Sequence, residues 1–309
     1  MPLDPQAKFS LEQRKAAGVP GQHEVSPEEA RRMQEAAPRK PGPEIGSTQD
    51  KEIPGTHGPI PIRIYTPEGT GPFPITMWFH GGGWVIGNIE TNDSTCRALA
   101  KSASSIIISV DYKLAPEHKF PIPFDDCYEA TCWAFKNAES FNGDSSNLAV
   151  AGASAGGNLA TAVSLKARDQ NGPVIKQQTL VYPVTDYDFS YESYSECKEG
   201  YGLEYATMVY FWNSYISTEQ DQENPYAVPM KAGNLSNLPP AFVLTVEFDP
   251  LRDEGEAYAN ALKQSNVPTK LTRYDGMIHA FFNAGIPFDQ TWDAIAEVCE
   301  ELKKAFGTT

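Results

Sequence analysis

One short stretch, residues 147–158, limits the fold of this chain more than any other. It opens with the apolar run Leu148–Ala151 and continues as GASAG at residues 152–156, a G-x-S-x-G pattern. That pattern is typical of a sharp turn from a strand into a helix, with Ser154 at its tip. Small residues suit so tight a turn, because the strand and helix backbones nearly touch there. A serine in such a turn is either a nucleophile or only part of the turn, and the rest of the chain has to decide between them.

Strands and helices alternate from about residue 52 to the C-terminus. Apolar or alternating runs predict strands at Ile60–Tyr65, Ile75–His80, Ile106–Asp111, Leu148–Ala151, Gln178–Tyr182, Phe242–Phe248 and Thr269–Tyr274. Helices are predicted at about 91–102, 123–140, 155–169, 253–264 and 289–306. This alternation predicts an α/β fold with a mostly parallel central sheet and helices on both faces. In such folds, functional sites form at the carboxyl ends of the strands.

Two segments depart from the alternation. Residues 1–50 are polar, proline-rich and helix-prone, so we expect either a disordered tail or an arm that lies over the rest of the chain. Within them, Ser26 and Pro27 predict the N-cap and first position of a helix that continues to Pro38. Residues 186–237 hold one amphipathic helix, at about 203–217, and many tyrosines. We expect these tyrosines to form a small core, with some of them lining a pocket. The chain is thus predicted to have an N-terminal arm that belongs to a cap, a cap insert at 186–237, and a core in two parts, 51–185 and 238–309.

The composition argues against several kinds of partner. The formal net charge of −15 disfavours nucleic acid and anionic membrane surfaces, since both require basic patches. No run of roughly 18 apolar residues occurs, so we expect neither a transmembrane helix nor stable membrane association. The N-terminus lacks a basic-then-apolar signal, which predicts a cytoplasmic protein. Five cysteines without C-x-x-C spacing, and histidines without ligand spacing, argue against disulfides and metal sites. No cofactor is expected.

A run of glycines directly follows a predicted strand, in His80-Gly81-Gly82-Gly83-Trp84. Consecutive glycines cost backbone entropy, which is justified where a backbone must approach a ligand closely. The run lacks the lysine of a phosphate-binding loop and does not match G-x-G-x-x-G. We therefore expect an oxyanion hole, in which the N–H groups of Gly82, Gly83 and Ala155 converge on a negatively charged oxygen. His80 is expected to hold the glycine loop in shape rather than to act as a base.

Three acids near the end of a later strand compete for a catalytic role, namely Glu247, Asp249 and Asp253. Glu247 lies within the strand, and Asp253 is placed to stabilise the start of the next helix. Asp249 lies at the strand tip and is the acid we select. His279 follows the last strand and is the only histidine after Asp249. The other histidines, His23, His57 and His118, have no such placement.

The order Ser, Asp, His is that of α/β-hydrolases. The chain resembles the hormone-sensitive-lipase-like branch of the α/β-hydrolase esterases. The matching motifs are His80–Trp84, Asp111–Glu117, Gly152–Asn158, Asp249–Gly255 and Gly276–Phe281. The resemblance covers most of the predicted core and implies a helical cap built from the N-terminal arm and the insert.

The resemblance also implies site residues and a mechanism. The catalytic triad would be Ser154, His279 and Asp249, and the oxyanion hole Gly82, Gly83 and Ala155. The chain departs from the family at Ala153, where Asp or Thr is usual, and at Lys113, where Arg is usual. Neither departure removes a catalytic group. Asp126 and Glu117 match family positions that we interpret as structural.

We therefore predict a serine carboxylesterase that hydrolyses short- to medium-chain acyl esters of small molecules. Two alternatives remain open: an amide or acetyl hydrolase with the same triad, and a catalytically weak small-ligand receptor on the same fold. Some relatives of the receptor kind have lost the catalytic histidine, whereas His279 is present here. A homodimer is compatible with the strand Thr269–Tyr274, which we expect near a sheet edge, together with the last helix.

Overall fold

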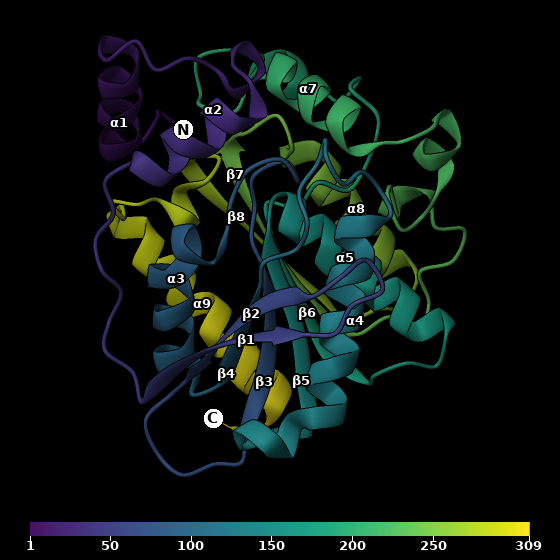
Figure 1. Ribbon diagram of the computed structural model, residues 1–309. Helices are drawn as coiled ribbons and strands as arrows, with labels where there is room; N and C mark the ends of the chain where they lie inside the picture. The colour runs from purple at the N-terminus through teal and green to yellow at the C-terminus, as the bar shows by residue number, and fades with distance from the viewer. Residues whose placement is uncertain (309) are drawn as a thin grey trace.

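The computed structural model describes residues 1–308, and within them a single sheet runs through the molecule (Figure 1). Its eight strands have the order β1-β2-β4-β3-β5-β6-β7-β8. The strands are β1 Ser47–Ile53, β2 Ile60–Thr66, β3 Phe73–Phe79, β4 Ile106–Val110, β5 Gly143–Ala153, β6 Ile175–Val181, β7 Ala241–Phe248 and β8 Thr269–Ile278. The β1–β2 and β2–β4 pairs are antiparallel and all the others are parallel, which confirms the predicted mostly parallel sheet.

Helices cover both faces of the sheet. The α-helices of the described residues are α1 Pro5–Ala16, α2 Pro27–Ala36, α3 Ile89–Ala103, α4 Ile122–Asn137, α5 Ala155–Asp169, α6 Glu192–Glu196, α7 Tyr205–Tyr215, α8 Arg252–Gln264 and α9 Asp289–Phe306. Helices α3 and α9 pack together on one face, whereas α4, α5 and α8 cover the other (Figure 1). Each predicted helix of the core is present, with ends within a few residues of those expected.

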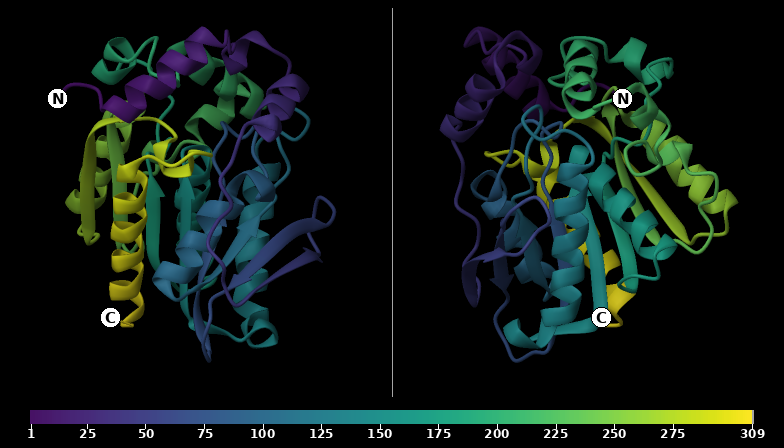
Figure 2. Two further views of the ribbon diagram at one scale, coloured as in Figure 1. Left: turned by 90° about the vertical axis from the view of Figure 1, so that its left-hand side faces the viewer. Right: turned by 45° about the vertical axis from the view of Figure 1, so that its right-hand side comes forward.

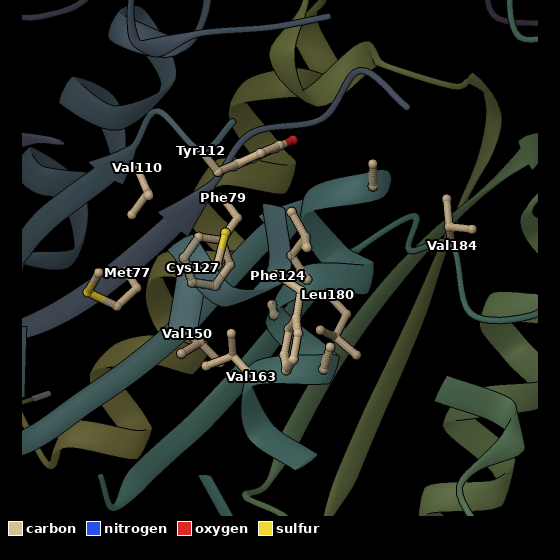
Figure 3. Close-up of a cluster of buried hydrophobic side chains, with 14 of the residues drawn as sticks. Met77, Phe79, Val110, Tyr112, Phe124, Cys127, Val150, Val163, Leu180 and Val184 are labelled. Carbon is tan, nitrogen blue, oxygen red and sulfur yellow. The ribbon is translucent and has the colours of Figure 1, made fainter. Parts of the chain in front are cut away.

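The sheet separates two hydrophobic cores. Every residue of β3 is buried, as expected for a strand covered on both faces. Successive side chains alternate between the cores, so that Met77 packs toward α4 and α5 while Trp78 packs toward α3 and α9. Figure 3 shows the first core, where Phe124 and Val163 from the helices meet Val150 and other side chains of the strands.

The N-terminal segment forms two helices rather than a disordered tail. Helix α2 begins as the sequence predicts, with the Ser26 hydroxyl capping the Glu29 N–H and with Pro27 in the first turn. Helix α1 was not predicted, and its N-cap is Asp4, whose carboxylate accepts from the Gln6 N–H at 2.8 Å. Figure 2 shows these helices beside α7 at the same end of the sheet. The grouping of arm and insert into one cap stays a prediction.

Strand β1 lies across the predicted boundary between arm and core at residue 50. Its sequence, STQDKEI, is polar, and only Ile53 is buried, so no apolar alternation marks it as a strand. It is held by antiparallel pairing with β2 from Ser47 opposite Thr66 to Ile53 opposite Ile60. Local pattern could not reveal it, because its backbone partner supplies the stabilisation.

Candidate active site

Ser154 lies between the last residue of β5 and the first residue of α5. Its backbone has φ +58° and ψ −121°, a strained conformation for a residue with a side chain. The Ser154 N–H donates to the Val181 carbonyl at 2.8 Å, which ties the turn to β6. The flanking glycines are sterically required, because a Cβ on Gly156 would lie 1.9 Å from the Phe79 carbonyl oxygen. The structure therefore has the predicted strand–turn–helix unit with the serine at its tip.

The structure brings the three predicted side chains into one hydrogen-bonded chain. His279 Nε2 lies 3.0 Å from Ser154 Oγ, and His279 Nδ1 lies 2.7 Å from Asp249 Oδ2. Asp249 is fully buried, and its other carboxylate oxygen accepts from the Leu251 N–H at 2.9 Å. Ser154 is 7% exposed. A carboxylate in this position holds the imidazole with Nε2 facing the hydroxyl and stabilises the imidazolium that forms when Nε2 takes a proton.

The two rival acids have other partners. Glu247 accepts from the Gly276 N–H at 2.7 Å and pairs with the N-terminal amine. The Asp253 carboxylate accepts from the Ser193 N–H at 2.8 Å and pairs with Arg252. Neither forms a hydrogen bond with the His279 ring among the described residues, so the geometry distinguishes Asp249 from its neighbours.

Two side chains near His279 were not singled out from the sequence. The Tyr182 ring lies 4.6 Å from the imidazole, centroid to centroid. Its hydroxyl donates to Asn283 Oδ1 at 3.0 Å, and the Asn283 amide donates to Asn92 Oδ1 at 3.1 Å. These bonds fix the segment that follows His279 to α3. The only available signal was the position of Tyr182 at the carboxyl end of a predicted strand.

The glycine loop after β3 lies directly beside the serine. A Cβ on Gly81 would be 3.3 Å from the Ser154 Cβ. Gly82 and Gly83 have φ +118° and +58°, which glycine adopts at little cost. Within the described residues, neither of these two N–H groups donates a hydrogen bond to another backbone carbonyl of a turn or loop. Ala155 is the first residue of α5, where a helix leaves its N–H unpaired. Three unpaired donors therefore belong to the two segments around Ser154.

His80 has the structural environment that the sequence predicts. It is fully buried, and burial lowers its pKa to about 4, so the ring is neutral near pH 7. Its Nδ1 lies 2.8 Å from the Gly81 carbonyl oxygen. The ring stacks on Tyr112, whose hydroxyl donates to the His80 carbonyl at 2.7 Å. His80 thus supports the start of the glycine loop.

The departure at Lys113 preserves an ion pair. Lys113 Nζ lies 3.2 Å from Asp126 Oδ2, and the Lys113 N–H donates to the same oxygen at 3.0 Å. Burial raises the pKa of Asp126, while these contacts with Lys113 oppose that rise. Lysine therefore serves the structural role at this position, and Asp126 lies outside the hydrogen-bonded chain of Ser154.

Aromatic side chains of α7 cover the glycine loop. A Cβ on Gly83 would lie 2.1 Å from the Phe211 ring, so that ring packs directly on the loop. Trp84 is sandwiched in the same region, stacked on Tyr215 at 4.1 Å and tilted against Trp212 at 4.8 Å. Tyr215 is fully buried, in agreement with the expectation that several of these aromatics form a small core.

The part of the chain described here contains no group of His, Cys, Asp and Glu side chains that could hold a metal ion. Its cysteines are unpaired thiols. None of its helices is both long and apolar enough to cross a membrane.

Comparison with known proteins places this fold and site in a family. Residues 76–283 match the model of a family with the alpha/beta hydrolase fold. An arylesterase of Saccharolobus solfataricus is 41% identical over 290 residues, which are 92% of this chain and 94% of that protein. The ester hydrolase EH1AB1 from the metagenome of Lake Arreo superposes with a TM-score of 0.94 at 39% identity, covering 99% of this chain and 100% of its own. A hyperthermophilic esterase from Pyrobaculum calidifontis has a TM-score of 0.92 at 38% identity, covering 98% of this chain and 99% of its own.

The chain therefore belongs to the α/β-hydrolase family, in its hormone-sensitive-lipase-like esterase branch. This agrees with the resemblance inferred from the motifs.

Proposed function

We propose that the protein is a serine carboxylesterase in which Ser154 is the nucleophile, His279 the general base and acid, and Asp249 the orienting carboxylate. One observation above all supports this: a continuous chain from a buried carboxylate through an imidazole to a hydroxyl, with bonds of 2.7 and 3.0 Å. The esterase names of the relatives, among them an arylesterase, support the choice of ester substrates.

The proposed reaction has two halves. His279 Nε2 takes the proton of Ser154 Oγ as the oxygen attacks the ester carbonyl carbon, and the carbonyl electron pair moves onto its oxygen. The N–H groups of Gly82, Gly83 and Ala155 stabilise that oxyanion. As the intermediate collapses, the alcohol leaves with the proton from His279. A water molecule, deprotonated by the same imidazole, then attacks the acyl carbon, releasing the acid and restoring Ser154.

The proposed substrates are short- to medium-chain acyl esters. The packing of Phe211 on Gly83 supports a limited space above the oxyanion loop, because the ring fills part of it. Retention of His279 within reach of Ser154 favours catalysis over a receptor that only binds its ligand. We also propose a cytoplasmic location.

The test is hydrolysis of p-nitrophenyl esters from acetate to palmitate by the wild type, Ser154→Ala and His279→Ala. A p-nitroanilide is assayed in parallel as the amide substrate. Each substitution is expected to lower kcat by about 10⁴-fold or more, and the double variant to be little worse than either single variant. Matched controls are Ser164→Ala, whose hydroxyl donates only to the Ala160 carbonyl, and His118→Ala.

Activity should be highest toward short and medium chains and absent with palmitate. Ester hydrolysis by Ser154→Ala near the wild-type rate would refute the assignment. If the wild type cleaves the anilide but none of the esters, the protein is an amide hydrolase and not an esterase.

A further inference from the structure

Arg31 of helix α2 connects the N-terminal arm to the glycine loop. Its Nε donates to the Val85 carbonyl at 2.8 Å, and its Nη2 donates to the Ala115 carbonyl at 3.0 Å. The same guanidinium pairs in a bidentate manner with Glu117, at 2.9 and 2.7 Å. Arg31 is 26% exposed, so a large part of it is withdrawn from water. Four donor contacts therefore hold this side chain, two to backbone carbonyls of the core and two to the Glu117 carboxylate.

The glycine loop needs such support because its conformation is irregular. Four of its residues have positive φ: Gly82, Gly83, Trp84 and Gly87. No strand or helix ladder holds such a segment, so individual hydrogen bonds define its shape. Among residues 1–308, Arg31 is the one side chain of the arm that donates to a carbonyl of residues 81–87.

The contact reaches the proposed oxyanion donors through a short path. The Val85 N–H donates to the Gly82 carbonyl at 3.0 Å, so Val85 closes a turn around Gly82 and Gly83. The Ala115 N–H donates to the Trp84 carbonyl at 2.8 Å. Arg31 binds both Val85 and Ala115, and so it fixes the far end of the turn to the neighbouring segment. The Ile86 N–H donates to the Gly82 carbonyl as well, at 3.0 Å, so the turn itself persists without Arg31, and the Arg31 contact fixes where the turn lies relative to the neighbouring segment.

We infer that Arg31 is a positioning residue for the oxyanion loop, acting through the Val85 and Ala115 carbonyls. Packing of the N-terminal arm against the core thereby fixes the direction in which the Gly82 and Gly83 N–H groups point. The inference rests on the proposed serine-esterase function. It assigns to α2 a part in transition-state stabilisation and not only in covering the substrate.

The ion pair with Glu117 is not the interaction by which Arg31 positions the loop. Glu117 is 53% exposed, and exposed ion pairs contribute little. The hydrogen bond from Arg31 lowers the pKa of Glu117, whose carboxylate is therefore ionised near pH 7. The two carbonyl contacts use Nε and Nη2 of Arg31 and do not involve Glu117, so we expect both to remain when its charge is removed.

The experiment compares Arg31→Ala, Arg31→Gln and Arg31→Lys with two matched controls. Arg32→Ala removes the next arginine on α2, which is 66% exposed and pairs only with Glu29 within the described part of the chain. Glu117→Gln removes the ion pair alone. Active sites are counted with a fluorophosphonate that labels the serine, and kcat and KM on p-nitrophenyl butyrate are then expressed per labelled site. Binding of an alkyl trifluoromethyl ketone, which forms an oxyanion on the serine, gives a second readout.

For Arg31→Ala and Arg31→Gln, kcat per labelled site should fall about 10- to 100-fold, with KM changed less than about threefold, because part of an oxyanion contact is lost. Affinity for the ketone should fall by a similar factor. Arg31→Lys should recover part of the loss, since lysine reaches one carbonyl but lacks the fork of arginine. Both controls should stay within about twofold of wild type.

A residue that only supports folding would lower the number of labelled sites and leave kcat per site unchanged, and that outcome would overturn the inference. So would equal losses in Arg31→Gln and Glu117→Gln. Should Arg31→Ala fail to fold, Arg31→Gln and Arg31→Lys carry the test. Failure of the proposed function has a different signature, since wild type and Ser154→Ala would then hydrolyse the ester equally.

Discussion

The contact between Phe211 and Gly83 allows a sharp test of the oxyanion loop. A Cβ added to Gly83 would lie 2.1 Å from the Phe211 ring, whereas carbon atoms in contact are roughly 3.5–4.0 Å apart. The ring or the loop must therefore move by about 1.5 Å in Gly83→Ala. Alanine in the left-handed conformation of this residue, φ +58°, costs a further 1–2 kcal/mol or so. Both effects act on the peptide that presents the Gly83 N–H.

We expect Gly83→Ala to lower kcat about 10²- to 10³-fold, the usual loss for one oxyanion donor. Adding Phe211→Ala removes the clash but not the backbone strain. The double variant should therefore regain at least about tenfold of the lost kcat, which corresponds to a coupling of about 1.4 kcal/mol.

The assay is kcat per labelled serine on p-nitrophenyl butyrate across the full double-mutant cycle. The matched control is Phe189→Ala, another aromatic residue of the insert, whose ring contacts Tyr187, Tyr194 and Tyr205. It should not rescue Gly83→Ala. A wild-type kcat in Gly83→Ala would contradict the proposed role of the Gly83 N–H, and so would equal rescue by Phe189→Ala.

Two further predictions concern stability and assembly. His80 is buried as the neutral form, with a pKa of about 4 against about 6.5 when unfolded, so the unfolded chain binds more protons between these values and stability falls as the pH is lowered. From pH 7 to pH 5 this group should remove about 2 kcal/mol of the free energy of unfolding. In urea unfolding, the wild type should therefore lose about 2 kcal/mol more than His80→Asn over this range. Strand β8 lies at an edge of the sheet, and we predict a homodimer that uses this edge and α9. Sedimentation velocity should give twice the mass of the chain, and a purely monomeric boundary would contradict the prediction.

The fold class followed from the sequence because its signals are local. An apolar run as short as Ile106–Val110 is typical of a strand that is buried on both faces. Its place between helical stretches implies a parallel sheet. The start of α2 was readable for a similar reason, since Ser26 and Pro27 act within one turn. Strand β1 was not readable, because its polar side chains are exposed and its stability comes from pairing with β2.

The candidate site likewise has features that the sequence revealed and others that depend on the folded chain. The residues that could form it were evident from the sequence, because a G-x-S-x-G turn, a glycine run and an acid at a strand tip each have a local steric or chemical reason. The sequence also predicted their order, with Ser154 before Asp249 and Asp249 before His279. The folded chain was needed to show that Asp249, and neither Glu247 nor Asp253, lies 2.7 Å from the imidazole. A distance between residues 30 positions apart depends on how two loops pack.

The same holds for the residues that no motif indicated. Arg31 is separated from Val85 by 54 positions, and Tyr182 from Asn283 by 101. An arginine on a polar helix and an asparagine after a short turn look like ordinary surface residues in the sequence. They acquire a role only when folding brings a guanidinium to a loop carbonyl and an amide to a tyrosine hydroxyl. The sequence therefore indicated the chemistry that we propose for this chain, and the packing of arm, insert and sheet placed the side chains that support the proposed site.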